Sequence, residues 1–310
     1  MRSSTDHSAQ AAHPAEPPVR YTLAGGRIGV DNLGAYLRTT VEATFWLGAA
    51  PLPTRLLWRI HAYHASRYVQ RWWARGVSRT LALQIDWNGL DHIDSHTSYV
   101  VTPLHEGLVD ALAVLQLPLP LRFVVRDEFV DWRLLGTYLR DTEQIAIRPE
   151  DGTRAYRTML RGARVVLARG ESLVVFPQGS ILGIETDFLP GAFALARALQ
   201  RPILPIALTG SHRVWEYPYT PRVRRGERMS VQVLPPIAAG EVCEWGIDEL
   251  RQEVQRRLKA AAFDRTMAPP RRFVPARDGY WDGYAYEIDP AFPDLAADVA
   301  AHRAGWARRS

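Results

Sequence analysis

Between residues 83 and 268, short hydrophobic runs that favour β-strands alternate with longer amphipathic stretches that favour helices. The predicted strands are Leu83–Trp87, Ser98–Thr102, Arg122–Arg126, Gln144–Arg148, Ser172–Phe176, Ile203–Leu208 and Ser230–Leu234. The predicted helices are Gly107–Leu117, Trp132–Arg140, Thr153–Arg169, Gly191–Leu199 and Ile247–Phe263. This alternation predicts an α/β domain over residues 83–268, with a mixed, largely parallel sheet of about seven strands covered by helices.

The chain before this domain divides into two parts. Residues 1–20 are rich in Ser, Ala, His and Pro without apolar periodicity, which predicts a disordered tail. This tail lacks the apolar centre of a secretory signal, so nothing in it marks the protein for export. Residues 21–82 are predicted to form an N-terminal amphipathic helical region, with a helical pair interrupted at residues 51–53, Pro-Leu-Pro.

The helical pair interleaves tryptophan and arginine side chains. Its longest uncharged stretch, Ala43–Thr54, is well short of the roughly 20 residues that a membrane-spanning helix needs. Two interpretations remain open. The helices can lie in a membrane interface, with tryptophan at the level of the headgroups and arginine pointing outward, or they can pack on the domain.

Residues 269–310 form an aromatic, turn-rich C-terminal extension. Tyr280, Trp281, Tyr284 and Tyr286 fall within seven residues, among glycine and aspartate. This run is too aromatic for a simple disordered tail. We expect it to pack on the domain, on a partner or on a membrane.

The overall composition narrows the class of protein only slightly. The 310-residue chain has a formal charge of +5 and one cysteine, Cys243, so it cannot form an internal disulfide, and a cysteine-based zinc site is nearly excluded. A single cysteine fits a reducing cytoplasm. The positive charge suits nucleic acid or anionic headgroups. However, no zinc-finger spacing, RNA-binding aromatic signature or dense basic run is present, and we predict no nucleic-acid partner.

The strongest local motif is His105 followed five residues later by Asp110, just after a predicted strand ends at Pro103. Ligands of open α/β sheets usually lie at the carboxyl ends of strands. Histidine suits general-base chemistry near neutral pH, and a carboxylate can orient its imidazole. Two helical residues at this spacing would point about 140° apart, so contact requires His105 to stand in the turn before the helix and fold back. Alone, such a pair is more often a helix-start histidine with a solvated aspartate.

Three other segments place polar groups or turns at strand ends. Phe176-Pro177-Gln178-Gly179 ends a buried strand in a tight turn that can approach a ligand, although such turns are common strand exits. Arg148 ends another strand, where it can bind phosphate or carboxylate, or form a surface ion pair. The strand around Pro205 is apolar and suits a sheet margin or simple core.

The order and spacing of these segments resemble the glycerolipid acyltransferase superfamily, which includes bacterial 1-acylglycerol-3-phosphate acyltransferases and lysophospholipid relatives. The resemblance covers roughly residues 87–237. The family's first block, His-x-x-x-x-Asp, matches His105 and Asp110, and its second block ends a strand in Arg, matched by Arg148. The fourth block, an apolar strand with an internal proline, is matched at Pro205.

The third block departs from the family pattern. The family has Phe-Pro-Glu-Gly-Thr-Arg-Ser, whereas this chain has Gln178 in place of Glu and Ile181 in place of Arg. Family members are thought to hold the acceptor's phosphate near these positions. The chemistry is therefore better supported than the acceptor, and the nearby Arg126 and Arg213 are candidate replacement cations.

The resemblance implies that His105 acts as the base and Asp110 orients it, while Arg148, Phe176, Pro177, Gln178 and Gly179 contact substrate. The implied donor is acyl-CoA or acyl-carrier protein, used as substrate, with no cofactor or metal. The implied acceptor is a lysophospholipid or related lipid. A glycolipid or glycosylated terpenoid acceptor, thioester hydrolysis and an inactive membrane-binding relative remain alternatives. We expect a cytoplasmic protein, peripheral on the inner face of the cell membrane. The sequence leaves the oligomeric state open.

Overall fold

A computed structural model describes residues 21–23, 28–30, 32–49, 53, 56–57, 60, 63–131, 135–215, 223–278 and 286–307. The predicted tail at residues 1–20 and most of the aromatic run at 279–285 lie outside the described residues.

The centre of the molecule is a seven-stranded sheet with the order β3-β9-β8-β4-β7-β5-β6. Its strands are β3 (Gln84–Asn88), β4 (Val100–Pro103), β5 (Leu121–Arg126), β6 (Ile145–Ile147), β7 (Ser172–Val174), β8 (Ile203–Thr209) and β9 (Arg228–Val233). Neighbouring strands are parallel except β8 and β9, which are antiparallel. All seven predicted strands are confirmed, as is the mixed, largely parallel sheet. The carboxyl ends of β4, β5, β6, β7 and β8 share one edge.

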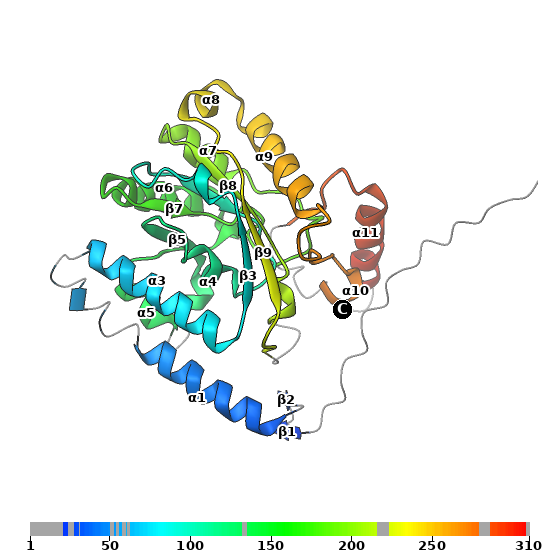
Figure 1. The fold of residues 1–310 in the computed structure, drawn as a ribbon. Helices are drawn as coiled ribbons and strands as arrows, with labels where there is room; N and C mark the ends of the chain where they lie inside the picture. Colours follow the sequence, from blue (N-terminus) through cyan, green and yellow to red (C-terminus); the bar gives the residue numbers. More distant parts are fainter. Residues whose placement is uncertain are drawn as a thin grey trace, which may run out of the picture.

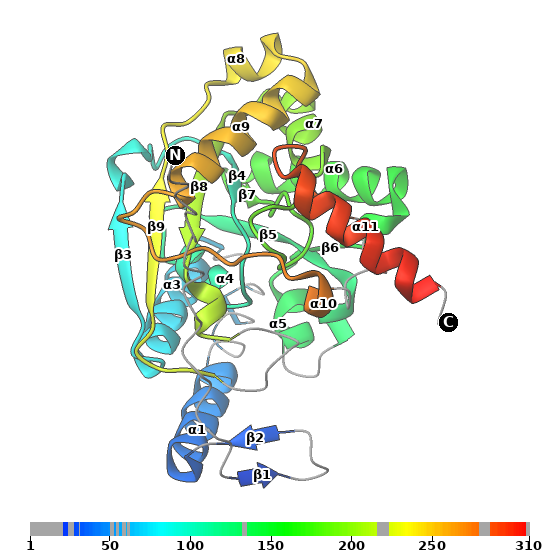
Figure 2. The same cartoon turned by 90° about the vertical axis from the view of Figure 1, so that its right-hand side faces the viewer.

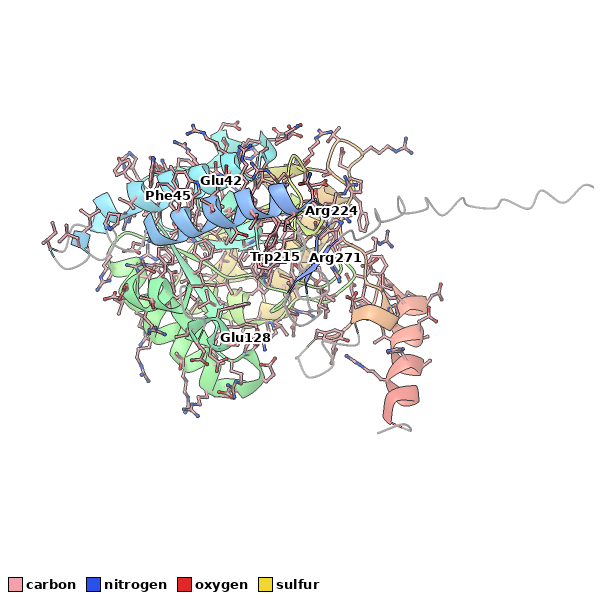
Figure 3. All side chains as sticks on the ribbon, turned by 90° about the horizontal axis from the view of Figure 1, so that it is seen from below. Glu42, Phe45, Glu128, Trp215, Arg224 and Arg271 are labelled. Atoms are coloured by element: carbon pink, nitrogen blue, oxygen red, sulfur yellow. The ribbon has the colours of Figure 1, made fainter. Side chains whose placement is uncertain are left out.

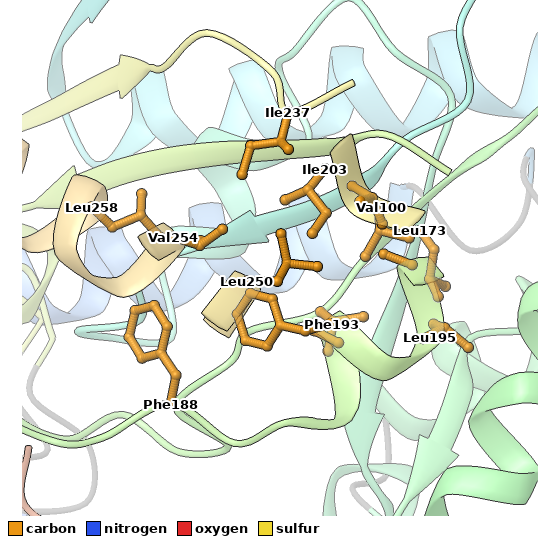
Figure 4. Close-up of a cluster of buried hydrophobic side chains, with 14 of the residues drawn as sticks. Val100, Leu173, Phe188, Phe193, Leu195, Ile203, Ile237, Leu250, Val254 and Leu258 are labelled. Atoms are coloured by element: carbon orange, nitrogen blue, oxygen red, sulfur yellow. The ribbon is translucent and has the colours of Figure 1, made fainter. Parts of the chain in front are cut away.

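Helices cover both faces of this sheet (Figure 1). One face carries α6 (Thr153–Ala168), α7 (Gly191–Ala198), α8 (Ala239–Glu244) and α9 (Ile247–Ala262). Their apolar side chains meet those of β4, β7 and β8 in the cluster drawn in Figure 4, where Phe193 and Leu250 are fully buried. The other face carries α3 (Tyr63–Thr80), α4 (Asp110–Val114) and α5 (Leu135–Asp141). Burial of both faces explains why β4 and β8 are buried at every position.

One predicted helix begins later than its sequence indicates. The stretch Gly107–Leu117 was expected to be helical, but α4 begins only at Asp110. The preceding turn is held instead by the Asp110 carboxylate, which accepts hydrogen bonds from the main-chain N–H groups of Glu106 and Gly107. A side chain thus replaces the first helical turn.

The N-terminal region is not helical from its start. Residues 21–82 were assigned to a helical region, but Tyr21–Leu23 and Ile28–Val30 form an antiparallel pair, β1 and β2. The sequence between them contains Gly25-Gly26, a dipeptide typical of turns. Most of the predicted break, at Pro51 and Leu52, lies outside the described residues.

Helix α1 (Leu33–Ala49) packs on α3 through Trp46. The Trp46 indole donates a hydrogen bond to Thr80 Oγ1 at 2.6 Å, and the Trp73 indole donates to the Trp46 carbonyl at 2.7 Å. The Trp46 ring fills the space beside Gly76, where a Cβ would lie 2.3 Å from it. Among the described residues, none of the helices is long and apolar enough to cross a bilayer.

The C-terminal extension packs back on the domain. It contains α10 (Pro275–Asp278) and α11 (Pro293–Ala307), which contact each other and lie on the side of the molecule that faces the viewer in Figure 2. Phe273, Tyr286 and Val299 bury their side chains against Ile181 and Leu182. The Lys259 ammonium, buried in α9, lies 2.5 Å from a carboxylate oxygen of Asp289 and anchors the extension further. Burial lowers the pKa of Lys259, and the bond to Asp289 opposes that shift.

Candidate active site

His105 and Asp110 form a hydrogen-bonded pair at the carboxyl end of β4. His105 Nδ1 lies 2.7 Å from Asp110 Oδ2. A carboxylate only accepts, so Nδ1 carries the proton and Nε2 is left as an acceptor. The His105 side chain is 17% exposed, whereas that of Asp110 is fully buried. The imidazole therefore reaches solvent while the carboxylate that orients it does not, an arrangement that suits a general base acting on a bound hydroxyl.

The predicted fold-back of His105 is what brings the pair together. The turn between β4 and α4 lets Asp110 Oδ2 accept from His105 Nδ1 and from the N–H groups of Glu106 and Gly107, at 2.7 and 3.0 Å. Three donors on one carboxylate oxygen fix both the turn and the imidazole. A solvated aspartate would leave the imidazole free to rotate.

The third block lies directly beside this pair, on the loop after β7. The Phe176 ring stacks on the His105 imidazole with centroids 4.0 Å apart and planes 21° apart. Because β7 neighbours β4, the two strand ends bring these rings together. Phe176 thus covers one face of the imidazole. Pro177 precedes Gln178 and accepts a hydrogen bond from the Leu189 N–H through its carbonyl at 2.7 Å.

Gln178 has a different position from the expected substrate contact. Its side chain is buried, and Oε1 accepts a hydrogen bond from the His105 N–H at 2.7 Å. Its Nε2 lies 3.5 Å from the Gly183 carbonyl oxygen and 3.4 Å from Thr186 Oγ1. Gln178 therefore supports the main chain of His105, and its side chain faces protein.

Arg126 and Gly179 connect the third block to the neighbouring strands. Gly179 has a φ of +71°, a conformation that favours glycine, and its carbonyl accepts a hydrogen bond from Arg126 Nη1 at 3.1 Å. Arg126 Nη2 also donates to Glu150 at 2.8 Å. Arg126, predicted as a spare phosphate ligand, instead braces the loop that carries Phe176.

Arg148 and Arg213 are not brought to His105 by any described contact. Arg148 follows β6, three strands from β4, and its 59% exposed side chain pairs with Asp127 at 2.8 Å. This is the surface ion pair that was the alternative interpretation of the motif. Arg148 lines a cavity of about 350 Å³ with Asp127, Asp151 and Arg154. Arg213 ends the short turn Ser211–Arg213 after β8. Strand order separates Arg148 from the base.

Ile181 is buried in the apolar cluster formed with the C-terminal extension, with 5% of its surface exposed. The position where the family motif has Arg therefore faces Phe273 and Tyr286. An arginine there would lose its hydration without a partner in the cluster. The apolar Ile181 is therefore compatible with the C-terminal extension that packs on it.

Glu106 is a site residue that the sequence gave no reason to select. Its buried carboxylate accepts hydrogen bonds from the Gly210 and Arg271 N–H groups, each at 2.8 Å, and lies 3.2 Å from His212 Nδ1. Glu106 therefore connects the turn between β4 and α4 with the turn after β8 and with the C-terminal extension, near the Arg271 labelled in Figure 3. The one feature of the sequence that could have drawn attention to Glu106 is that a charged residue stands between His105 and an apolar helix. Among the described residues, no group of three or more His, Cys, Asp or Glu side chains is arranged to hold a metal ion.

Comparisons with known proteins point to acyltransferases. Residues 84–209 match the family model described as Acyltransferase. The chain is 29% identical over 177 residues to a 1-acyl-sn-glycerol-3-phosphate acyltransferase of Limnanthes alba, covering 56% of this chain and 60% of that protein. A protein of the same description from Bacillus subtilis (strain 168) is 23% identical over 123 residues, covering 39% of this chain and 60% of that protein.

A solved structure shares the fold. The 1-acyl-sn-glycerophosphate (LPA) acyltransferase PlsC from Thermotoga maritima superimposes with a TM-score of 0.60 at 18% identity, over 74% of this chain and 94% of that one. The chain spans about 60% of the length of the Limnanthes relatives it matches. Part of this chain is thus similar in sequence to 1-acyl-sn-glycerol-3-phosphate acyltransferases, and the chain shares the fold of a solved one.

Proposed function

We propose that the chain transfers a fatty acyl group from a thioester donor, acyl-CoA or acyl-carrier protein, to a hydroxyl of a lysophospholipid. The observation that carries this proposal is the 2.7 Å bond between His105 Nδ1 and Asp110 Oδ2, which leaves Nε2 as the proton acceptor at a partly exposed strand end. The family match over residues 84–209 and the similarity to 1-acyl-sn-glycerol-3-phosphate acyltransferases support this class of reaction.

In the proposed reaction, His105 Nε2 takes the proton from the acceptor hydroxyl as its oxygen attacks the thioester carbonyl. The buried Asp110 carboxylate stabilises the imidazolium that forms. When the tetrahedral intermediate collapses, the carbon–sulfur bond breaks and the imidazolium returns the proton to the thiolate. The products are an ester and a free thiol. This sequence uses no cofactor and no acyl-enzyme.

Purified protein incubated with radiolabelled palmitoyl-CoA tests this proposal, with and without a lysophospholipid mixture. Label in a diacyl lipid supports acyl transfer. Label only in free palmitate, at the same rate without lipid, identifies a hydrolase. No turnover with palmitoyl-CoA or a palmitoylated carrier protein favours the membrane-binding relative.

The proposed setting is the cytoplasmic face of the cell membrane, where the protein is peripheral. Exposed apolar side chains on α1 support this: Leu37, Val41 and Phe45 are 55%, 69% and 61% exposed and, four residues apart, share one face. Phe45 lies on the side of the molecule seen in Figure 3. Tyr68 and Trp72 on α3 are also exposed. Such a surface fits partial insertion at headgroup level.

A second proposal concerns the acceptor, and it departs from the phosphate monoester in the relatives' names. Ile181, which is buried, stands where the motif has a cationic arginine. Arg148 pairs with Asp127 and follows β6, three strands from the β4 strand that precedes His105. We propose an acceptor with a phosphodiester headgroup or a sugar, a glycolipid or glycosylated terpenoid included. The ratio of kcat/KM values described in the Discussion tests it.

A further inference from the structure

Helix α6 carries a row of arginines on its outer face. Arg154, Arg157, Arg161 and Arg164 are all exposed, and α6 contains no acidic residue. At 100° per residue, the four positions lie within about 80° of one another and span about 15 Å along the axis. The opposite side of the helix, with Met159 and Val166, is buried against the sheet. The row is therefore a continuous basic ridge, here called the α6 ridge.

The α6 ridge lacks the ion pairs that other arginine-bearing helices of this chain have. On α9, Arg251 pairs with Asp187, and Arg256 and Arg257 both pair with Glu253, each at 2.7 Å. In the described part of the chain, none of the α6 ridge arginines has an acidic partner within ion-pair distance. Repulsion between four unpaired cations on one helix face is unfavourable. An anionic partner would relieve that repulsion.

The position of the ridge separates it from the proposed membrane surface. Helix α6 packs in the hydrophobic cluster on one face of the sheet, whereas α3 packs in the cluster on the other. In both views α1 lies at the lower end of the molecule and α6 lies in its upper half (Figures 1 and 2). A bilayer that contacts Leu37 and Phe45 on α1 would therefore leave the α6 ridge facing away from it. The ridge is better suited to a dissolved partner.

The ridge begins at the edge of the sheet that holds the active site. Helix α6 follows β6, and β6 lies three strands from β4, about 14 Å at the usual strand spacing. Arg126 links the two places, because it donates hydrogen bonds both to the Gly179 carbonyl and to Glu150, just before α6. A partner bound on α6 can thus reach His105 only through a flexible arm.

We propose that the α6 ridge is the docking surface for a small acidic carrier protein, which delivers the acyl group to His105 on its flexible thioester arm. This inference rests on the proposed acyl transfer and selects the donor. A single nucleotide, as in acyl-CoA, would contact one end of the ridge. An acidic helix of a carrier protein would match its whole length of about 15 Å. Such contacts chiefly accelerate association and select the partner.

The test compares two double variants with equal changes of charge. Arg157→Glu/Arg161→Glu reverses the middle of the ridge. Arg197→Glu/Arg265→Glu is the control, because both arginines are exposed and have no ion pair in the described part of the chain. For each protein, KM is measured for a palmitoylated bacterial acyl carrier protein and for palmitoyl-CoA, with the same lysolipid. Direct binding of the palmitoylated carrier protein is measured by interferometry.

The ridge variant should raise KM for the carrier protein about tenfold or more at low salt and weaken its binding equally, with KM for palmitoyl-CoA within about twofold. The control should change neither, and the difference should shrink as salt rises. Equal effects on both donors, or no effect, would overturn the inference and leave acyl transfer standing. A wild type that uses palmitoyl-CoA but not the palmitoylated carrier protein would also overturn the inference and leave acyl transfer standing. If neither donor reacts, the proposed function fails, and the interferometry measurement alone shows whether the carrier protein binds the α6 ridge.

Discussion

The side-chain amide of Gln178 holds the main chain of His105, with Oε1 accepting the His105 N–H at 2.7 Å. The two residues are 73 positions apart and meet because β7 lies beside β4 in the sheet. The third motif block thus supports the first. Gln178 stands where the family motif has Glu, and its amide keeps the side-chain oxygen that accepts this hydrogen bond.

Replacing Gln178 distinguishes two roles of its side chain, which are support of the His105 main chain and contact with substrate. Gln178→Leu leaves the His105 N–H without its acceptor, at a cost of about 1–3 kcal/mol. We expect a lower melting temperature and a kcat reduced about tenfold or more. Gln178→Glu keeps the acceptor oxygen and should retain most of kcat. If Gln178→Leu raises KM for the lipid and leaves kcat unchanged, the side chain contacts substrate instead.

Removing the imidazole should abolish transfer without unfolding the protein. His105 is at a partly exposed turn, and His105→Ala removes the proposed base, whose contribution is typically about 10²–10⁴-fold in rate. Initial rates with labelled palmitoyl-CoA measure the loss, and circular dichroism checks the fold. His96→Ala, at an exposed histidine, is the matched control. A folded His105→Ala variant with more than a tenth of wild-type kcat would refute the assignment.

Asp110→Asn should lower kcat much more than it changes KM. The amide is nearly isosteric, but it lacks the charge that stabilises the imidazolium in the transition state. We expect a loss of about 10²-fold or more in kcat. Asp91→Asn, at an exposed aspartate, controls for loss of charge. A change confined to KM would place Asp110 in substrate binding.

The acceptor should not be a phosphate monoester. Loss of one charge-assisted contact costs roughly 1.5–3 kcal/mol, about tenfold to a hundredfold or slightly more in affinity. We therefore expect kcat/KM for lysophosphatidic acid to be below that for diester or sugar-bearing lysolipids of the same chain length. A clear preference for lysophosphatidic acid would contradict this. It would direct attention to Arg126 and Arg213, whose replacement by Ala should then raise KM for that substrate.

The α1 surface should bind anionic vesicles. Sedimentation with vesicles of mixed neutral and anionic phospholipid should recover the protein in the pellet, and recovery should fall as salt rises. Leu37→Ser/Val41→Ser/Phe45→Ser removes the exposed apolar face and should reduce binding at every salt concentration. The double variant Ala35→Ser/Thr40→Ser, at two exposed positions of α1, is the control. Equal partition of the wild type with and without vesicles would exclude this surface as a membrane contact.

The sequence by itself predicted the strands and helices of the domain, and it singled out His105 and Asp110 as a candidate base and its orienting carboxylate. Strands such as β8 and helices such as α6 can be predicted from the sequence because each has a pattern of buried positions within a few neighbouring residues. Such a pattern is a local property. The motif order added the family. Local patterns do not give strand order, so Arg148 seemed as close to His105 as Phe176.

Tertiary structure decided which of these residues meet. Phe176 and Gln178 contact His105 because β7 neighbours β4, whereas Arg148 follows a strand two places further along the sheet. Ile181 is inaccessible because a segment about ninety residues later in the chain covers it with Phe273. Glu106 acquires its three partners from the turn that follows β8 and from the extension. Such contacts depend on long-range pairing and packing, which residue periodicity does not encode.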